Sequence, residues 1–121
     1  MIEQYKETLK RVIARRPNGF TFNLRSNSFP NSGYAVASAA TQDCIGKSGL
    51  FRVLKYCMRH PQYCVGCWVN EDGEMQYDAT MIYRDFSSAI AAAIANKQRA
   101  IFNLYTGREI MECDYNSSIA A

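Results

Sequence analysis

The segment from residue 63 to residue 83 constrains the fold more than any other part of the sequence. Two stretches of β-forming residues, 63–70 and 75–83, flank Glu71-Asp72-Gly73-Glu74, a combination that favours a tight turn. The second stretch alternates. One face carries Met75, Tyr77, Ala79, Met81 and Tyr83, and the other carries Gln76, Asp78, Thr80 and Arg84, with Ile82 as the exception. This pattern predicts a β-hairpin with one face in the core and the other partly solvated.

The position of Trp68 depends on the length of this turn. A two-residue turn at Asp72-Gly73 pairs Trp68 with Tyr77 on the core face, which is the arrangement we expect. A one-residue bulge would instead place Trp68 opposite Asp78 on the open face. With Trp68 in the core, the open face is semi-apolar, and such surfaces often mark a partner contact. The predicted partner-binding face consists of Val65, Cys67, Val69, Gln76, Asp78 and Thr80.

Helix and strand patterns flank the hairpin on both sides. Apolar residues at helical spacing predict helices over 2–15, over about 48–59, and from 85 or 87 to about 98. Short β-forming stretches predict strands over 20–24, 34–40 and 100–105, with a short edge piece over 109–113. The tail from Asp114 is expected to fray.

From residue 34 onward the order is strand, helix, strand, strand, helix, strand. This order predicts an α+β fold with a ferredoxin-like βαββαβ core over 33–113, in which both helices cover one face of an antiparallel sheet. The N-terminal helix and strand, 1–24, would be added at a sheet edge or over the second face. No linker or repeat divides the chain, so we expect a single domain over 1–121 with a frayed tail at 114–121.

Composition excludes several classes of protein. With 121 residues, 48% hydrophobic and 21% charged, the chain is typical of a globular domain. No apolar run approaches the roughly 20 residues that span a bilayer. The first residues are partly acidic and lack the apolar core of a signal peptide, so we expect a cytoplasmic location. A net charge of +3 is too small for a dedicated nucleic-acid-binding protein.

Cys57, His60, Cys64 and Cys67 are the residues that most suggest chemistry, because their types suit zinc. However, Cys57 lies on the buried stripe of a predicted helix. Cys64 and Cys67 are three apart on a predicted strand, so they point to opposite faces unless the strand breaks near Pro61. A dyad of Cys44 with His60 would span on the order of 20 Å at 1.5 Å per residue. We expect buried structural cysteines, no metal and no cofactor, and a zinc or thiol enzyme is the third hypothesis.

Two basic features suggest a ligand-binding alternative. Gly46-Lys47-Ser48 ends a segment between a strand and a helix, as in a phosphate-binding loop, but Thr41 stands where that motif needs its first glycine. Lys47 and Ser48 could still hold an anion at the helix N-terminus. The basic residues of the first helix could contact nucleic-acid phosphates, although Glu3 and Glu7 are spaced to pair with them. Nucleic-acid binding is therefore not favoured.

Four phrases of the sequence together resemble small uncharacterised accessory proteins of gut-bacterial phages and conjugative elements. They are Asn18-Gly-Phe-Thr-Phe-Asn-Leu, Gly33-Tyr-Ala-Val-Ala, Gly66-Cys-Trp-Val-Asn-Glu-Asp-Gly-Glu and Ala100-Ile-Phe-Asn-Leu-Tyr-Thr-Gly-Arg-Glu-Ile. The resemblance covers about residues 18–110. Those proteins carry Gly-Gly-Trp where this chain has Gly66-Cys67-Trp68, which weakens a ligand role for Cys67. The resemblance supplies no catalytic residues.

The resemblance implies a mobile-element accessory protein, a class that often binds host proteins, including defence proteins. The first expectation is therefore a non-catalytic protein that binds and modulates a bacterial host protein. Counter-defence is one role that such binding could serve. The contact would be made through the sheet face and its edges. The same surface could support a homodimer. A small-ligand or nucleic-acid-binding module is the alternative.

Overall fold

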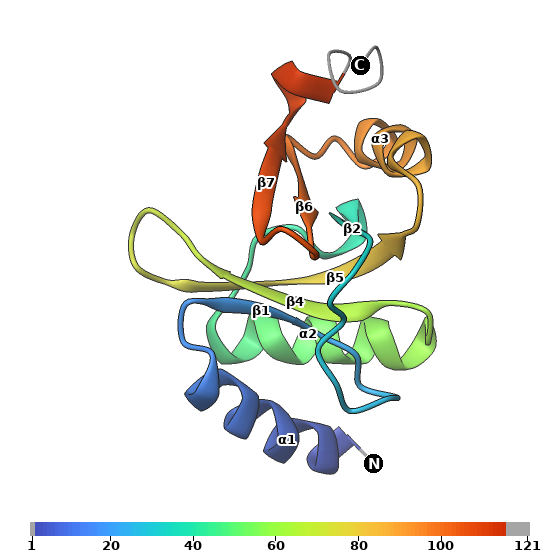
Figure 1. Cartoon of the computed structure of the whole chain (residues 1–121). Helices are drawn as coiled ribbons and strands as arrows, with labels where there is room; N and C mark the ends of the chain where they lie inside the picture. Colours follow the sequence, from blue (N-terminus) through green and yellow to red (C-terminus); the bar gives the residue numbers. More distant parts are fainter. Residues whose placement is uncertain (1, 116–121) are drawn as a thin grey trace.

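The computed structural model describes residues 2–115 and has a mixed α+β fold, as predicted. Three helices pack on one curled sheet (Figure 1). The helices are α1 (Ile2–Arg15), α2 (Gly46–Arg59) and α3 (Phe86–Ala95). The strands are β1 (Gly19–Phe22), β2 (Tyr34–Ala37), β3 (Cys44–Ile45), β4 (Cys64–Val69), β5 (Met75–Tyr83), β6 (Ala100–Asn103) and β7 (Arg108–Met111). Two short 3-10 helices are η1 (Ala39–Thr41) and η2 (Glu112–Asp114).

The sheet is antiparallel throughout and follows the order β1-β4-β5-β2-β6-β7. The predicted hairpin, β4 and β5, lies near its centre, and β1 extends it at the β4 edge. The N-terminal strand is thus an edge addition and does not cover the second face. The short β3 pairs with β5 beyond the end of β2. The exact ferredoxin-like topology is not confirmed, because this extra strand and the curl of the sheet depart from a simple βαββαβ core.

The helices cover the convex face of the curled sheet in two separate cores (Figure 1). The first core joins α1 and α2 to β1, β4 and β5, with Leu9, Leu54 and Val65 fully buried. The second joins α3 to β2 and β6 around Val36 and Ile101. Because side chains alternate along each strand, every second residue points instead to the concave face, where no helix packs in the described part of the chain.

Between β2 and β3 the chain leaves the sheet, and one backbone and one side-chain hydrogen bond to Ala79 replace the missing strand contact. The Ser38 backbone N–H donates to the Ala79 carbonyl at 2.8 Å. The Ala79 N–H in turn donates to Thr41 Oγ1 at 2.9 Å. Thr41 is buried, so its hydroxyl satisfies a backbone donor that water cannot reach. This arrangement keeps β5 continuous over nine residues.

Several predicted boundaries are wrong. Helix α3 ends at Ala95 rather than near residue 98, and β2 ends at Ala37 rather than at residue 40. Helix α2 begins at Gly46 rather than near Ser48, because Gly46 has a positive φ of 69° that turns the chain into the helix. The tail does not fray at Asp114: Asp114 belongs to η2, and Tyr115 is 3% exposed in the second core. The Tyr115 hydroxyl donates to the Gln98 carbonyl at 3.3 Å. The rest of the predicted tail, 116–121, lies outside the described residues.

Replacing Gly49 by alanine should destabilise the fold. A Cβ at Gly49 would stand 2.8 Å from both the Cα and the carbonyl oxygen of Cys44, where α2 crosses β3. Backbone atoms cannot rotate away, so we expect Gly49→Ala to lower the free energy of unfolding by about 1–3 kcal/mol, as overpacking does. Urea denaturation measures this loss.

The matched control is Ser48→Ala, one residue earlier and exposed in the same helix. It should change stability by no more than about 0.5 kcal/mol. Equal stability of Gly49→Ala and the wild-type protein would contradict the close packing of α2 on β3.

Candidate binding groove

The turn between β4 and β5 is a three-residue loop, Glu71-Asp72-Gly73. The Asn70 N–H donates to the Glu74 carbonyl at 2.9 Å, and the Gly73 N–H donates to the Asn70 carbonyl at 3.0 Å. Gly73 has a φ of 78°, the left-handed conformation that closes a three-residue hairpin loop. The Asn70 side chain holds the loop, since its Oδ1 accepts the N–H groups of Asp72 and Glu74 at 3.0 and 2.9 Å.

The predicted two-residue turn is therefore wrong, and the pairing differs by one residue. Trp68 lies opposite Gln76 on the open face, not opposite Tyr77 in the core. A one-residue change of register turns every side chain of β4 to the other face. Val65 and Cys67, predicted on the open face, are 0% and 5% exposed in the first core. Val69 shares their side of the sheet but is 40% exposed at the end of β4, and it also contributes to the lining of the groove.

Gln76, Asp78 and Thr80 point to the open face and line it, although Thr80 is only 4% exposed there. Trp68 joins them, 46% exposed. Direct pairing across the strands puts Gly19, Trp68 and Gln76 in one row and Thr21, Gly66 and Asp78 in the next. The concave face thus combines an exposed aromatic ring with a set of short polar side chains.

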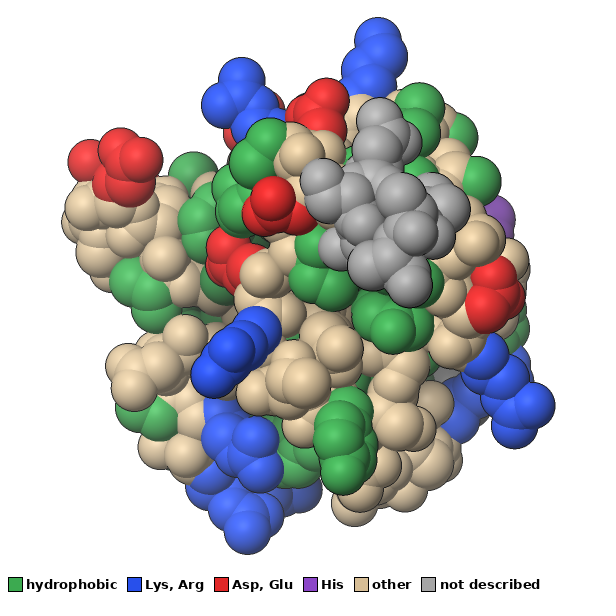
Figure 2. All heavy atoms as spheres, turned by 45° about the horizontal axis from the view of Figure 1, so that its top comes forward, with side chains coloured by type: hydrophobic (Ala, Val, Ile, Leu, Met, Phe, Trp, Pro, Cys, Tyr) green, Lys and Arg blue, Asp and Glu red, His purple; other side chains and the backbone are tan. Residues whose placement is uncertain are grey.

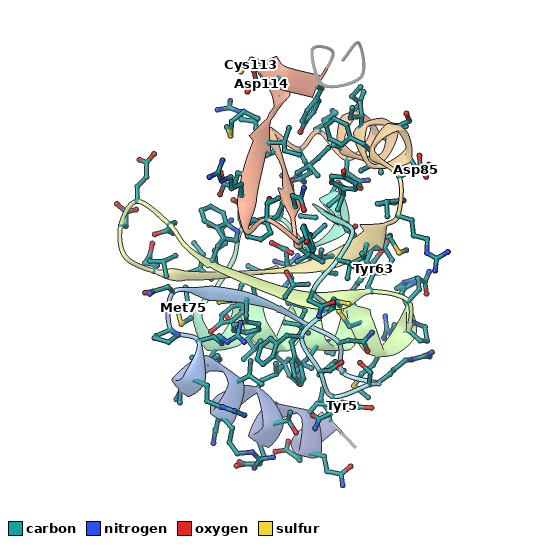
Figure 3. All side chains as sticks on the ribbon, viewed as in Figure 1. Tyr5, Tyr63, Met75, Asp85, Cys113 and Asp114 are labelled. Carbon is teal, nitrogen blue, oxygen red and sulfur yellow. The ribbon has the colours of Figure 1, made fainter. Side chains whose placement is uncertain are left out.

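The curl of the sheet makes this face a groove of about 900 Å³. Its walls come from two directions: β1, β4 and β5 on one side, and β2, β6 and the adjoining loops on the other (Figures 1 and 3). Besides Trp68, the large exposed apolar residues of the lining are Val69 of β4 and Phe102 of β6. The acidic β4–β5 turn projects beside the groove and is visible as a protruding lobe in Figure 2.

Asp78 lies at the floor of the groove, directly across from Gly66. A Cβ at Gly66 would collide with Asp78 Oδ1 and stand 2.7 Å from Thr80 Oγ1. Glycine is therefore needed so that these two side chains can lie over β4, where the Thr80 hydroxyl donates to the Asp78 carboxylate. A lone glycine inside a strand pattern is a signal of such a close approach, and it could have located Asp78 from the sequence.

Burial among groove atoms raises the pKa of the Asp78 carboxyl above its ordinary value, although hydrogen bonding by Thr80 and Trp68 acts in the opposite direction. Within residues 2–115 the ion pairs are Lys6–Glu3 and Lys10–Glu7, both on α1. Asp78 therefore carries no ion-pair partner in the described part of the chain. The other charged residues of the lining are Arg16, Asp43, Lys97, Arg99 and Glu109.

The cysteine-rich segment does not form a site. Cys57 and Cys67 lie in the first core, and Cys64 is also buried. The Cys57 thiol donates to the Cys64 carbonyl at 3.6 Å. Burial raises the thiol pKa of Cys57 and Cys67 to about 12 and that of Cys64 to about 11, so these groups stay protonated near neutral pH.

His60 and the remaining cysteines lie apart from that cluster. His60 is exposed and stacks on Tyr56 with ring centroids 4.3 Å apart. Cys44 is buried in β3, and burial raises its thiol pKa. Cys113 is exposed at the far end of β7 (Figure 3). Among residues 2–115, no three His, Cys, Asp or Glu side chains converge in a geometry that could hold a metal ion.

The predicted anion-binding residues are outside the groove. Lys47 and Ser48 are exposed in the first turn of α2, where Ile45 precedes the helix without a capping side chain. On α1, Lys6 and Lys10 lie 3.4 and 3.3 Å from Glu3 and Glu7, as their spacing predicts. These features remain a predicted alternative.

No family model, curated protein or solved structure matches this chain. In residues 2–115, none of the helices has the length and apolar character needed to cross a membrane. The groove is therefore interpreted from its own geometry.

Asp78→Asn should make the protein more stable at neutral pH. The folded protein holds the Asp78 proton more tightly than the unfolded chain, so the charged carboxylate destabilises the fold above its raised pKa. The amide keeps an acceptor for Thr80 and removes the charge. As the pH falls through that raised pKa, the wild-type protein should gain stability and the advantage of the variant should shrink.

Thermal unfolding of both proteins between pH 4 and pH 8 measures this effect. Asp72→Asn, at the exposed turn, is the control for a change in net charge and should not stabilise. If Asp78→Asn is less stable than the wild-type protein at every pH, Asp78 has a structural role and the interpretation of a strained groove charge is wrong.

Proposed function

We propose that the protein is a non-catalytic binding protein that holds part of a partner protein in the concave groove. One observation carries the proposal: the sheet leaves its concave face without a helix in the described residues, and that face presents a half-exposed tryptophan beside a carboxylate. A large exposed aromatic residue in a concave polar surface is the usual composition of an interface hot spot.

The extent of the groove favours a protein segment as the occupant. Its lining comes from β1, β4, β5, β2 and β6 together with the loops before β3 and after α3. Small-molecule sites usually enclose most of their ligand, whereas this groove is open along the sheet. Trp68 and Phe102, from opposite walls, are suited to anchor an apolar side chain between them.

The resemblance to accessory proteins of phages and conjugative elements supplies the proposed partner class. Under this proposal the partner is a bacterial host protein, with defence proteins as the leading candidates. The buried and protonated thiols agree with a function that needs no nucleophile. A small ligand in the same groove is the alternative, since about 900 Å³ also falls within the range of ligand pockets.

Truncating Trp68 should remove partner binding. We expect tagged wild-type protein to capture a stoichiometric partner from bacterial lysate and Trp68→Ala to bind that partner at least about tenfold more weakly, because a central aromatic contributes roughly 2 kcal/mol or more. The purified pair is then measured by calorimetry.

Tyr105→Ala is the matched control, because Tyr105 is the most exposed aromatic residue among those described, at 82%, and does not line the groove. It should bind as the wild-type protein does. A partner that binds Trp68→Ala and wild-type protein equally, or the absence of any stoichiometric partner, would contradict the proposal.

A further inference from the structure

We propose that the floor of the groove recognises an arginine side chain of the partner, with its guanidinium donating to the Asp78 carboxylate and stacking on the exposed face of the Trp68 indole. This inference rests on the proposed function and names the chemical group that the groove selects. It is drawn from charge, from the neighbouring aromatic ring and from the space above the carboxylate.

The charge argument starts from the hydrogen bonds of Asp78. Its Oδ1 accepts from the Thr80 hydroxyl, and hydrogen bonding by the Trp68 side chain also lowers the pKa of the carboxyl. A carboxylate has about four acceptor positions, so positions remain for a further donor. No lysine, arginine or histidine in residues 2–115 forms an ion pair with it. Buried carboxylates are normally paired, because desolvation of an isolated charge is costly. A cation from the partner would supply the missing ion pair. Its attraction to the carboxylate would be stronger than in water, because the site is largely desolvated.

The aromatic argument rests on the register of β4 and β5. Trp68 and Asp78 occupy adjacent rows of the same strand pair, and their side chains share the concave face. Tryptophan attracts cations through the face of its ring more strongly than other aromatic residues do. A planar guanidinium can stack on an indole and still donate to a carboxylate, whereas an ammonium group presents only a point charge.

The space above the floor comes from Gly66 and the alanines of β2. Gly66 has no side chain, so the Asp78 carboxylate can lie against β4 within the lining of the groove. Ala35 and Ala37 line the opposite wall with small side chains. The bases of the lining, Arg16, Lys97 and Arg99, could instead attract an anion, and the experiment includes that outcome.

Fluorescence measures occupancy of this site directly, because Trp68 is the only tryptophan of the chain. The probes are acetyl-Ala-Arg-Ala-amide, its lysine analogue and its citrulline analogue, in which a neutral urea replaces the guanidinium. We expect the arginine peptide to change the emission saturably at about millimolar concentration, as suits a short ligand. The lysine peptide should bind more weakly, and the citrulline peptide should bind at least about tenfold more weakly.

The variants locate the effect. Asp78→Asn, with folding checked by circular dichroism, should lose at least about tenfold in affinity for the arginine peptide, and Tyr105→Ala should lose none. The inference is overturned if the arginine peptide gives no saturable change, if citrulline binds equally well, or if inorganic phosphate saturates the signal and arginine does not. The comparison of arginine with citrulline uses the wild-type protein alone, so it holds even if a variant misfolds.

The result also separates this inference from the proposed function. A stoichiometric partner that depends on Trp68, combined with no response to arginine peptides, removes the arginine site and leaves the binding function. A response to arginine without any protein partner removes the binding function as proposed and leaves a cation site.

Discussion

The register of β4 against β5 is the constraint on which the rest of the structure depends. It is set by the Asn70 side chain, which accepts two backbone N–H groups of the turn, and by Gly73 in the left-handed conformation. Side chains alternate strictly along a strand. If the loop had two residues instead of three, every side chain of β4 would therefore lie on the other face of the sheet. The turn therefore decides which side chains enter the core and which reach the groove.

The two faces that result have different chemistry. The convex face buries Val65 and Cys67 beneath the helices, where thiols remain protonated and serve as small apolar groups. The concave face receives Gly66, Trp68 and Asp78. Three of these features are unfavourable in a protein without a partner. The carboxylate with a raised pKa and the strand glycine that makes room for it lower stability, and the exposed tryptophan lowers solubility. Departures of this kind from local stability rules concentrate at functional sites, which is why the groove carries the proposal.

Much of the fold could be predicted from periodicity. The first helix begins and ends where its apolar stripe and Pro17 indicate, and the strand patterns of 63–70 and 75–83 locate β4 and β5 to within one residue. The α+β class follows from the order of elements. These predictions succeed because burial of an apolar face determines each element locally. The predicted start of helix α2 is wrong because the conformation of a single glycine, Gly46 with its positive φ, determines where the helix begins.

The sequence predicts the β5 residues of the candidate site but not the β4 residues. The alternation along β5 predicts Gln76, Asp78 and Thr80 on the open face, whereas the faces of Trp68, Val65 and Cys67 depend on the length of the turn. Glu71-Asp72-Gly73-Glu74 fits both a two-residue and a three-residue loop, and the side chain that decides between them is Asn70, just outside the turn. The curl that makes the open face a groove arises from pairing between distant strands, β2 with β5 and β6, which local patterns do not encode.

Ionic quenching of Trp68 fluorescence tests most directly whether this ring and the Asp78 carboxylate share one solvent-accessible groove. A negative charge beside an exposed indole concentrates cations around it at low ionic strength. The measured quantity is the ratio of quenching by caesium to quenching by iodide. This ratio should be higher in the folded wild-type protein than in Asp78→Asn. Emission that neither ion quenches, or a caesium-to-iodide ratio that Asp78→Asn leaves unchanged, would contradict the account.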